Sequence, residues 1–341
     1  MKVHLICPGL FGLPCPDPRA LPQTPSLDRF LARADQKESP PRDPLETLAA
    51  QFGVRARPGG DLPSAALCLL AEAPDQARAG CWFHADPVHL RADRDRLLLF
   101  GGPSLAVTDA EAAALVSAFN AHFEAEGLVL MAPGPNRWYL RVPTVPRLRT
   151  QRMHRVSGRP LDAARLTGPE AGDWNRWQNE AQMLFHQHPV NQAREAAGLP
   201  GISGVWTWGG GVLPQVPGGP DLLAADHPLG LGLAGAMCGR RLALSELGQS
   251  PSIWQALAPE SVLIFWDRLW WLALAADSDA WCAALMELEV LIAGLTADLA
   301  AGRIRSLVLD DGERWGFGLT AWGLRRFWRR GGLRGRLAPP L

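Results

Sequence analysis

The sequence predicts an α/β fold with a mostly parallel sheet and a smaller inserted α/β domain. Two observations support this fold class. Short apolar segments bounded by glycine and proline alternate with longer helical patterns along the 341 residues, as strands and helices do in such folds. The texture of the sequence also changes near Gly80, after which CWFHADPVHL and DRLLLF are typical of strands. We therefore expect a core domain of residues 1–79 and 166–341, with residues 80–165 as the inserted domain.

The first eighty residues are expected to supply one strand and three helices. Residues 3–7 (VHLIC) form a short apolar strand that ends at a Pro-Gly turn. Ser26 is in position to cap a helix over SLDRFLARA, and the helix LETLAAQF ends at Gly53, a residue type suited to a left-handed C-cap. After a turn at residues 58–61, LPSAALCLLA is expected to be a buried helix.

The remaining elements follow in the same alternation. Thr108 and Glu111 form a capping box for an amphipathic helix, which the strands LVLMA and RWYLRV follow. Asp173 is expected to cap a further helix, and Pro189 to start a short one that Gly198 closes. VWTW leads as a strand into three glycines. The strand SVLIFWD, the long helix AWCAALMELEVLIAGLTADLAAG and the strand SLVLDD complete the core.

The composition excludes several classes of protein. Thirty-four basic and 34 acidic residues cancel, so we expect no global attraction to nucleic acid or to a membrane. The six cysteines form no CxxC pair and no zinc-like quartet. Asp267 and Arg268 interrupt the best candidate for a membrane span, residues 262–276, and no signal-peptide pattern precedes the first strand. We expect a cytoplasmic protein with no transmembrane segment.

Two residue types are distributed unusually. Fourteen tryptophans stand against one tyrosine, and because each indole needs a large cavity and a partner for its N–H, we expect several at pockets or interfaces. Arginines crowd the C-terminal tail, which fits either a solvated helix end or a contact with acidic lipid or a partner. They are Arg325, Arg326, Arg329, Arg330, Arg334 and Arg336.

The segment from 175 to 211, NRWQNEAQMLFHQHPVNQAREAAGLPGISGVWTWGGG, is the first candidate site. His186 and His188 do not form a metal pair within a helix, because side chains two residues apart diverge by about 200°; a capping role for one of them is expected instead. His188, Asn191 and Arg194 recur at three-residue steps near a helix N-terminus. They can bind an anion there, or they can only satisfy the loop backbone.

Three consecutive glycines close this segment. They allow the backbone to approach a ligand closely and to form an anion-binding nest, or they form a flexible turn. Neither GxGxxG nor GxxxxGK[ST] is present, so no dinucleotide or P-loop site is predicted. The glycines are Gly209, Gly210 and Gly211.

Basic residues also gather in the expected inserted domain, in HADPVHLRADRDRLLLF and NRWYLRV. A solvated strand face with self-paired charges accounts for this alternation. The alternative is a clamp for a phosphate or carboxylate, because arginine binds both groups bidentately. The candidate ligand contacts are His84, Arg91, Arg96 and Arg137, with His89, Arg94 and Arg141 beside them.

The order of these segments resembles the bacterial regulatory proteins called RpfE-type, through ADPVHLRADRDRL, NEAQMLFHQHPVNQARE, VWTWGGG and RRFWRR. More distantly, the chain is similar to archaeal-type cofactor-independent phosphoglycerate mutases of the alkaline-phosphatase superfamily. LPQTPSLDRFLARA resembles their TPNLDxLA segment, PGGDLPSAAL their PGSDxAxLSxLG segment, and HPVNQAREAAGLPGISGVWTWGGG their HPVNxxR…G segment. The resemblance implies an alkaline-phosphatase-like, doubly wound core with an inserted smaller domain.

The sequence departs from that family at the residues that carry its chemistry. The mutases use two metal ions and a serine that takes up the phosphoryl group. Where their opening strand ends in a metal-binding aspartate, this chain has Cys7 and Pro8, and their serine corresponds to Gly60, which has no side chain. Aspartates without the accompanying histidines remain as counterparts of the other metal ligands. They are Asp267, Asp310 and Asp311.

Three hypotheses follow. The first is a non-catalytic regulatory protein that binds a small phosphorylated or carboxylated metabolite through His188, Asn191, Arg194 and arginines of the inserted domain. The second is a metal-dependent phosphoryl transferase or phosphoglycerate mutase with a rebuilt site for Mn²⁺ or Mg²⁺, in which water or Ser64 is the nucleophile. Its metal ligands are Asp61, Asp267, Asp310 and Asp311.

The third hypothesis is a protein-interaction module that uses exposed tryptophans and the arginine tail. A protein partner is compatible with the sequence, and so is a homo-oligomer. No nucleic-acid partner is expected.

Overall fold

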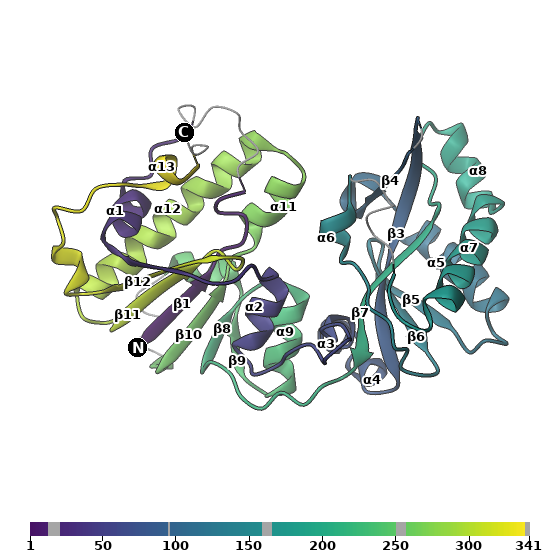
Figure 1. The fold of residues 1–341 in the computed structure, drawn as a ribbon, viewed down its shortest axis with the longest axis horizontal. Helices are drawn as coiled ribbons and strands as arrows, with labels where there is room; N and C mark the ends of the chain where they lie inside the picture. Colours follow the sequence, from purple (N-terminus) through teal and green to yellow (C-terminus); the bar gives the residue numbers. More distant parts are fainter. Residues whose placement is uncertain (13–20, 95, 159–165, 250–256, 338–341) are drawn as a thin grey trace. The chain divides into compact units, whose positions relative to one another are not determined.

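The chain folds into two compact units (Figure 1). The parallel-sheet unit contains Met1–Val54 and Val216–Leu341, and the antiparallel-sheet unit contains Arg55–Gln215. The computed structural model describes residues 1–12, 21–94, 96–158, 166–249 and 257–337.

The parallel-sheet unit is built on seven strands in the order β2-β12-β11-β1-β10-β8-β9. The strands from β11 to β9 run parallel, and β12 and β2 are added antiparallel at one edge. The predicted mixed α/β fold with a mostly parallel sheet is therefore confirmed. The strands are β1 (Lys2–Ile6), β2 (Asp35–Glu38), β8 (Leu222–Ala224), β9 (Arg240–Leu242), β10 (Ser261–Phe265), β11 (Ser306–Asp310) and β12 (Trp315–Thr320).

Helices cover both faces of this sheet. Leu222 and Ala224 of β8 belong to the core cluster that includes α1 and α12. Leu223 between them points to the opposite face, where Gly230 of α9 lies close to it and to Leu48 of α2. The helices are α1 (Pro25–Arg33), α2 (Pro44–Ala50), α9 (Pro228–Ala236), α11 (Arg268–Leu274), α12 (Ser278–Ala300) and α13 (Leu333–Leu337), with the 3₁₀ helices η4 (Leu244–Gln249) and η5 (Gly323–Arg325).

The start of α1 differs from the sequence prediction. The helix begins at Pro25, and its N-cap residue is Thr24, not Ser26. The carboxylate of Glu289 on α12 accepts hydrogen bonds from the backbone N–H groups of Ser26 at 2.7 Å and Leu27 at 2.9 Å. A buried acid from a distant helix therefore satisfies the first turn, which no local sequence signal reveals. By contrast, Gly53 after α2 has the predicted left-handed backbone, with a φ of 73°.

One helix among the described residues, α12, is long and apolar enough to cross a membrane by length and composition. We expected no segment of this length and hydropathy, and α12 is an exception. Trp281, Leu288 and Ile292 of α12 lie in the core cluster of the parallel-sheet unit, which is the position of a core helix. Residues 262–276, the best candidate in the sequence, form most of β10 and all of α11 instead of one helix.

The antiparallel-sheet unit has five strands, in the order β4-β3-β6-β5, with β7 paired to β3. All pairs in this unit are antiparallel, and the long strand β3 contacts three others. The strands are β3 (Cys81–Asp93), β4 (Arg96–Gly101), β5 (Val129–Gly134), β6 (Arg137–Val142) and β7 (Gly204–Val212). The helices are α3 (Ser64–Glu72), α4 (Pro74–Ala77), α5 (Asp109–His122), α6 (Met153–Val156), α7 (Ala171–His186) and α8 (Pro189–Ala196), with the 3₁₀ helix η2 (Gly102–Leu105).

This unit extends beyond residues 80–165 in both directions. Strand β7 joins its sheet by pairing with β3, and α3 packs against both strands. Helix α7 packs on β7, and its Trp174 and Phe185 belong to the same core cluster as Trp138 of β6. Residues 55–79 and 166–215 therefore belong to the antiparallel-sheet unit by their packing, whereas the sequence placed them in the core domain.

The helix ends of this unit test three sequence predictions. The capping box of Thr108 and Glu111 is confirmed at the start of α5. The short helix α8 begins at Pro189 as predicted. Asp173 as an N-cap was wrong: α7 starts at Ala171 with Glu170 as N-cap, and Asp173 lies in the first turn, where its charge still complements the helix dipole.

Candidate functional site

The carboxyl edge of the parallel strands is the usual ligand position in a doubly wound sheet. Cys7 follows β1, Asp267 follows β10, and Asp310 ends β11. The register places Ile6 of β1 beside Phe265 and beside Asp310. Cys7, Asp267, Asp310 and Asp311 therefore meet at this edge, whereas Asp61 belongs to the antiparallel-sheet unit.

Cys7 stands where the mutase-like pattern has a metal-binding aspartate. Burial raises the pKa of its thiol strongly, and the nearby carboxylates of Asp311 and Asp267 raise it further. The group is therefore a neutral thiol at neutral pH. Metals bind the thiolate, so this environment works against a role as ligand.

Asp310 is ionised and held by its neighbours. Its carboxylate accepts from Arg42 Nη2 at 3.2 Å and from the backbone N–H of Gly312 at 2.8 Å, and His4 Nε2 lies 3.7 Å away. Burial opposes ionisation, but the bonds from His4 and Gly312 and the charge of Arg42 outweigh it and lower the pKa of Asp310. The side chain is thus part of an internal ion pair.

Asp311 serves the turn between β11 and β12. Its Oδ1 accepts three backbone N–H groups, from Glu313 at 2.8 Å, Arg314 at 2.7 Å and Trp315 at 2.8 Å. Burial raises the pKa of Asp311, and these hydrogen bonds counter the effect only in part. The pattern is that of an aspartate that fixes a tight turn.

Asp267 accepts from Trp271 Nε1 at 3.1 Å, and the ring of Trp271 lies parallel to that of His227. His227 was not among the residues predicted from the sequence, although it follows β8 at the same edge. Its Nδ1 accepts the N–H of Leu229 at 3.1 Å and so caps α9. His188 caps α8 in the same way, through the N–H of Val190 at 3.2 Å. The dipeptide His-Pro is therefore the local signal for both caps.

These residues do not fit a two-metal site. Among the described parts of the chain, no group of three His, Cys, Asp or Glu side chains is arranged to hold a metal ion. Both oxygens of Asp310 are bonded by Arg42, and Oδ1 of Asp311 is bonded by turn N–H groups. Ser64 is fully buried at the start of α3, so a substrate does not reach its hydroxyl.

The polar residues of α8 are held by the fold. Arg194 is 1% exposed and donates to Glu111 at 2.9 Å, to the carbonyl of Pro200 at 2.8 Å and to the carbonyl of Leu105. Asn191 bonds the carbonyls of Phe185 and Ile202 at 2.8 Å and the N–H of Ile202 at 2.7 Å. These contacts occupy the donors that the expected anion contact requires. In the structure, Asn191 bonds backbone groups only, and Arg194 bonds two carbonyls and the side chain of Glu111.

The triple glycine forms a nest around an anion of the chain itself. The N–H groups of Gly209 and Gly210 bond the carboxylate of Asp61, which Thr150 also binds. Burial raises the pKa of Asp61, and these bonds offset part of the rise. Gly209 has a φ of 64°, and a Cβ added there would overlap Ser64, so the glycine is required for packing β7 against α3. Gly210 and Gly211 meet Phe83 and Pro63 in the same way.

The four basic candidates of the expected clamp do not converge. His84 is buried and stacks on Trp208 with ring centroids 3.9 Å apart. Arg137 pairs with Glu72 at 2.6 Å, and Arg96 lies exposed on β4. Arg91 is the candidate that lines a cavity.

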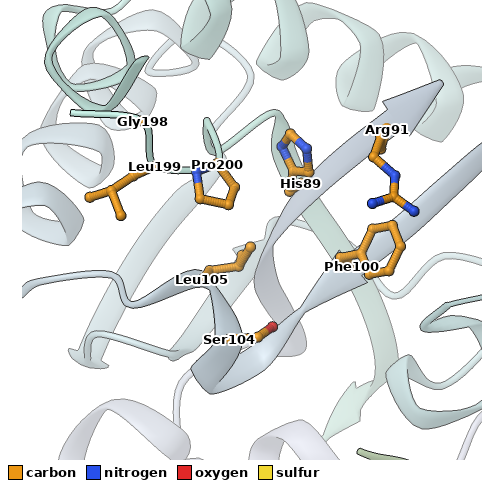
Figure 2. Close-up of a pocket in the computed structure, with 8 residues that line it drawn as sticks. All are labelled: His89, Arg91, Phe100, Ser104, Leu105, Gly198, Leu199 and Pro200. Carbon is orange, nitrogen blue, oxygen red and sulfur yellow. The ribbon is translucent and has the colours of Figure 1, made fainter. Parts of the chain in front are cut away.

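That cavity, of about 460 Å³, lies between the two segments that the sequence analysis singled out (Figure 2). Arg91 lies with its guanidinium carbon 4.7 Å from the centre of the Phe100 ring, and no carboxylate among the described residues pairs with it. The Nδ1 of His89 lies 2.8 Å from the carbonyl of Gly201, so Nδ1 carries the proton and Nε2 is left for other contacts. The lining residues are His89, Arg91, Phe100, Ser104, Leu105, Gly198, Leu199 and Pro200.

Arg194 does not line this cavity but holds two of the residues that do. Two of its acceptors, the carbonyls of Leu105 and Pro200, belong to lining residues. The polar motif of α8 therefore contributes to the cavity by holding its walls. No sequence signal marks Leu199 and Pro200 as lining residues. They reach the cavity because the end of α8 packs beside β3 and η2.

Comparison with known proteins gives a likeness of fold. No family model and no curated protein matches the chain. The PH0037 protein from Pyrococcus horikoshii is 15% identical, with 98% of this chain and 91% of that chain covered and a TM-score of 0.56. A cofactor-independent phosphoglycerate mutase from Thermoplasma acidophilum DSM 1728 is 14% identical, with 100% and 95% covered and a TM-score of 0.42. The chain is thus similar in fold to the Pyrococcus protein.

Proposed function

We propose that the protein is a non-catalytic binder of a small phosphorylated or carboxylated anion on a phosphoglycerate-mutase-like scaffold, with a regulatory role like that of the RpfE-type proteins it resembles. The observation that carries this proposal is Arg91, held over Phe100 at a cavity with no carboxylate partner among the described residues. A charged group at a cavity without an internal counter-charge is available to a ligand.

The chemistry of the cavity matches such a ligand. The guanidinium of Arg91 offers paired N–H donors to a phosphate or carboxylate. His89 adds a donor at Nε2 when its ring is protonated. Phe100, Leu105 and Leu199 present apolar surface to the carbon skeleton. A volume of about 460 Å³ is ample for a three- or four-carbon metabolite.

The non-catalytic part of the proposal rests on the residues where the mutase chemistry is expected. Gly60 has no nucleophile, Cys7 is held as a neutral thiol, and Ser64 is buried. Asp310 and Asp311 bind an arginine and a turn. Phosphoryl transfer requires an accessible nucleophile and charge stabilisation at one site, and these side chains do not supply either.

Titration calorimetry with inorganic phosphate and 3-phosphoglycerate tests the proposal, with glycerol as the uncharged control. We expect binding of the anions and a loss of about tenfold or more in affinity for Arg91→Met, since charged hydrogen bonds are removed. Arg96→Met, an exposed arginine on the adjacent strand, is the matched control and should bind as the parent does. Equal affinity in Arg91→Met would remove the cavity from consideration, and mutase turnover with Mn²⁺ or Mg²⁺ would contradict the non-catalytic part.

A further inference from the structure

Three large aromatic side chains are exposed near the end of the parallel-sheet unit. Trp322 is 67% exposed, Phe327 78% and Trp328 63%. They belong to residues 322–330, here called the aromatic–arginine segment, which follows β12 and leads to α13 in yellow in Figure 1. Scattered apolar residues on a surface need no explanation, but three large rings within seven residues indicate a contact surface.

Hydrogen bonds hold the segment in place, so the three exposed rings extend from a fixed backbone. Arg326 Nη1 donates to Asp35 at 2.5 Å and to the carbonyl of Arg33 at 3.2 Å. Arg329 Nη1 donates to Asp35 at 3.2 Å and to the carbonyl of Ala34 at 3.3 Å. Two arginines thus hold the segment on the end of α1, which lowers the entropy lost when the rings bind a surface.

The charge of the segment is positive. Arg325 and Arg330 are exposed, and no carboxylate among the described residues pairs with them. Asp35 is shared by Arg326 and Arg329, and the bond from Arg326 and the charges of both arginines lower the pKa of its carboxyl. Two of the four arginines therefore share one carboxylate, and Arg325 and Arg330 add positive charge to the segment. A complementary surface must be negatively charged and must also accept indole and phenyl rings.

We propose that the aromatic–arginine segment docks the protein on an anionic lipid bilayer. Indole rings prefer the water–hydrocarbon interface, where one edge is apolar and the other is wet. Arg325 and Arg330 would bind headgroup phosphates beside the rings. The formal net charge of the chain is zero, so the attraction depends on the local charge of this segment. The contact is peripheral, since the segment contains no helix long enough to span.

Co-sedimentation with vesicles tests this inference. We expect the full chain to bind vesicles that contain phosphatidylglycerol about tenfold or more tightly than vesicles of phosphatidylcholine alone. Added salt should weaken the binding, because it screens exposed charges. Arg325→Glu with Arg330→Glu should abolish the preference for anionic vesicles. Trp322→Ala with Trp328→Ala should reduce binding to both kinds, since the rings supply the apolar part.

Matched controls lie elsewhere on the same unit. Arg241→Glu changes an exposed arginine on β9, at the opposite edge of the sheet from β12 and β2, and Val290→Ala changes an apolar side chain that is 70% exposed on α12. Both variants should bind vesicles as the parent does, and thermal unfolding should show that all variants fold. Absence of vesicle binding, equal loss in the controls, or binding to polyglutamate or DNA but not to vesicles would overturn the inference. The anion titration in the cavity is independent of it.

Discussion

Arg91 and Arg194 belong to the two polar segments that stand out in the sequence, yet the fold gives them opposite roles. Arg194 is buried and its donors bind Glu111 and two carbonyls. Arg91 is exposed at the cavity and rests on Phe100 without a carboxylate partner among the described residues. A charged residue is therefore available to a ligand only where the fold brings it no partner of its own. Arg194 supports the cavity walls, and Arg91 faces the cavity.

The largest effect is expected from removing the buried charge. Arg194→Met leaves the carbonyls of Leu105 and Pro200 without this donor and Glu111 without its ion-pair partner. It should lower the free energy of unfolding by about 3 kcal/mol. Arg91→Met, the matched control, should change it by less than about 0.5 kcal/mol. Urea unfolding of both variants measures the difference. If Arg194→Met changes the free energy of unfolding only slightly and also loses anion affinity, Arg194 is a ligand contact and not a structural residue.

Asp86, a buried carboxylate with few hydrogen-bond donors, provides a second test through the pH dependence of stability. Asp86 receives the N–H of Trp208 at 2.6 Å, and burial raises its pKa from 3.8 to about 7. The folded protein therefore holds this proton more tightly than the unfolded chain does. The stability that the protonated Asp86 contributes is present in full below about pH 4 and is lost as the pH rises through about 7, by on the order of 4 kcal/mol.

Asp86→Asn keeps an acceptor for Trp208 and removes the titration. Unfolding in urea at a series of pH values should show a flatter profile for this variant than for the parent between about pH 4 and 7. The difference between the two profiles isolates Asp86 from other titrating groups. Parallel profiles would show that Asp86 is ionised throughout this range.

The smallest change in stability is expected when either histidine cap is removed. His188→Ala and His227→Ala should each lower the free energy of unfolding by about 1 kcal/mol, and asparagine should restore most of it, because it caps helices well. Thermal or urea unfolding measures both. Neither variant should change anion affinity if the cavity beside Arg91 is the site. If His188→Ala loses anion affinity and its free energy of unfolding is unchanged, His188 contacts the ligand and does not act as a cap alone.

Local signals in the sequence predicted what local contacts decide. The capping box of Thr108 and Glu111 and the start of α8 at Pro189 depend on residues within one turn, and both are confirmed. The mostly parallel sheet follows from the alternation of strands and helices. Distant contacts had no such signal: Arg194 and Glu111 are 83 residues apart, and Ser26 and Glu289 are 263 apart.

The same limit applies to the candidate site. The sequence makes Arg91 a candidate ligand contact, together with His84, Arg96 and Arg137, and composition does not separate the four. The separation comes from β3, whose pairing with β7 stacks His84 on Trp208, and from Glu72, which takes Arg137. Gly209 and Gly210 were expected to bind an anionic ligand, and in the structure their N–H groups bond Asp61 of the same chain.

The interrupted course of the parallel-sheet unit has a consequence for how the chain folds. Strand β1 pairs with β10 and β11, which lie more than 250 residues later, so the opening strand has no partner until most of the chain has been synthesised. The antiparallel-sheet unit is continuous from Arg55 to Gln215 and carries all of its own strand partners. We therefore expect it to acquire its structure first as the chain emerges, while the apolar strand β1 waits for its neighbours.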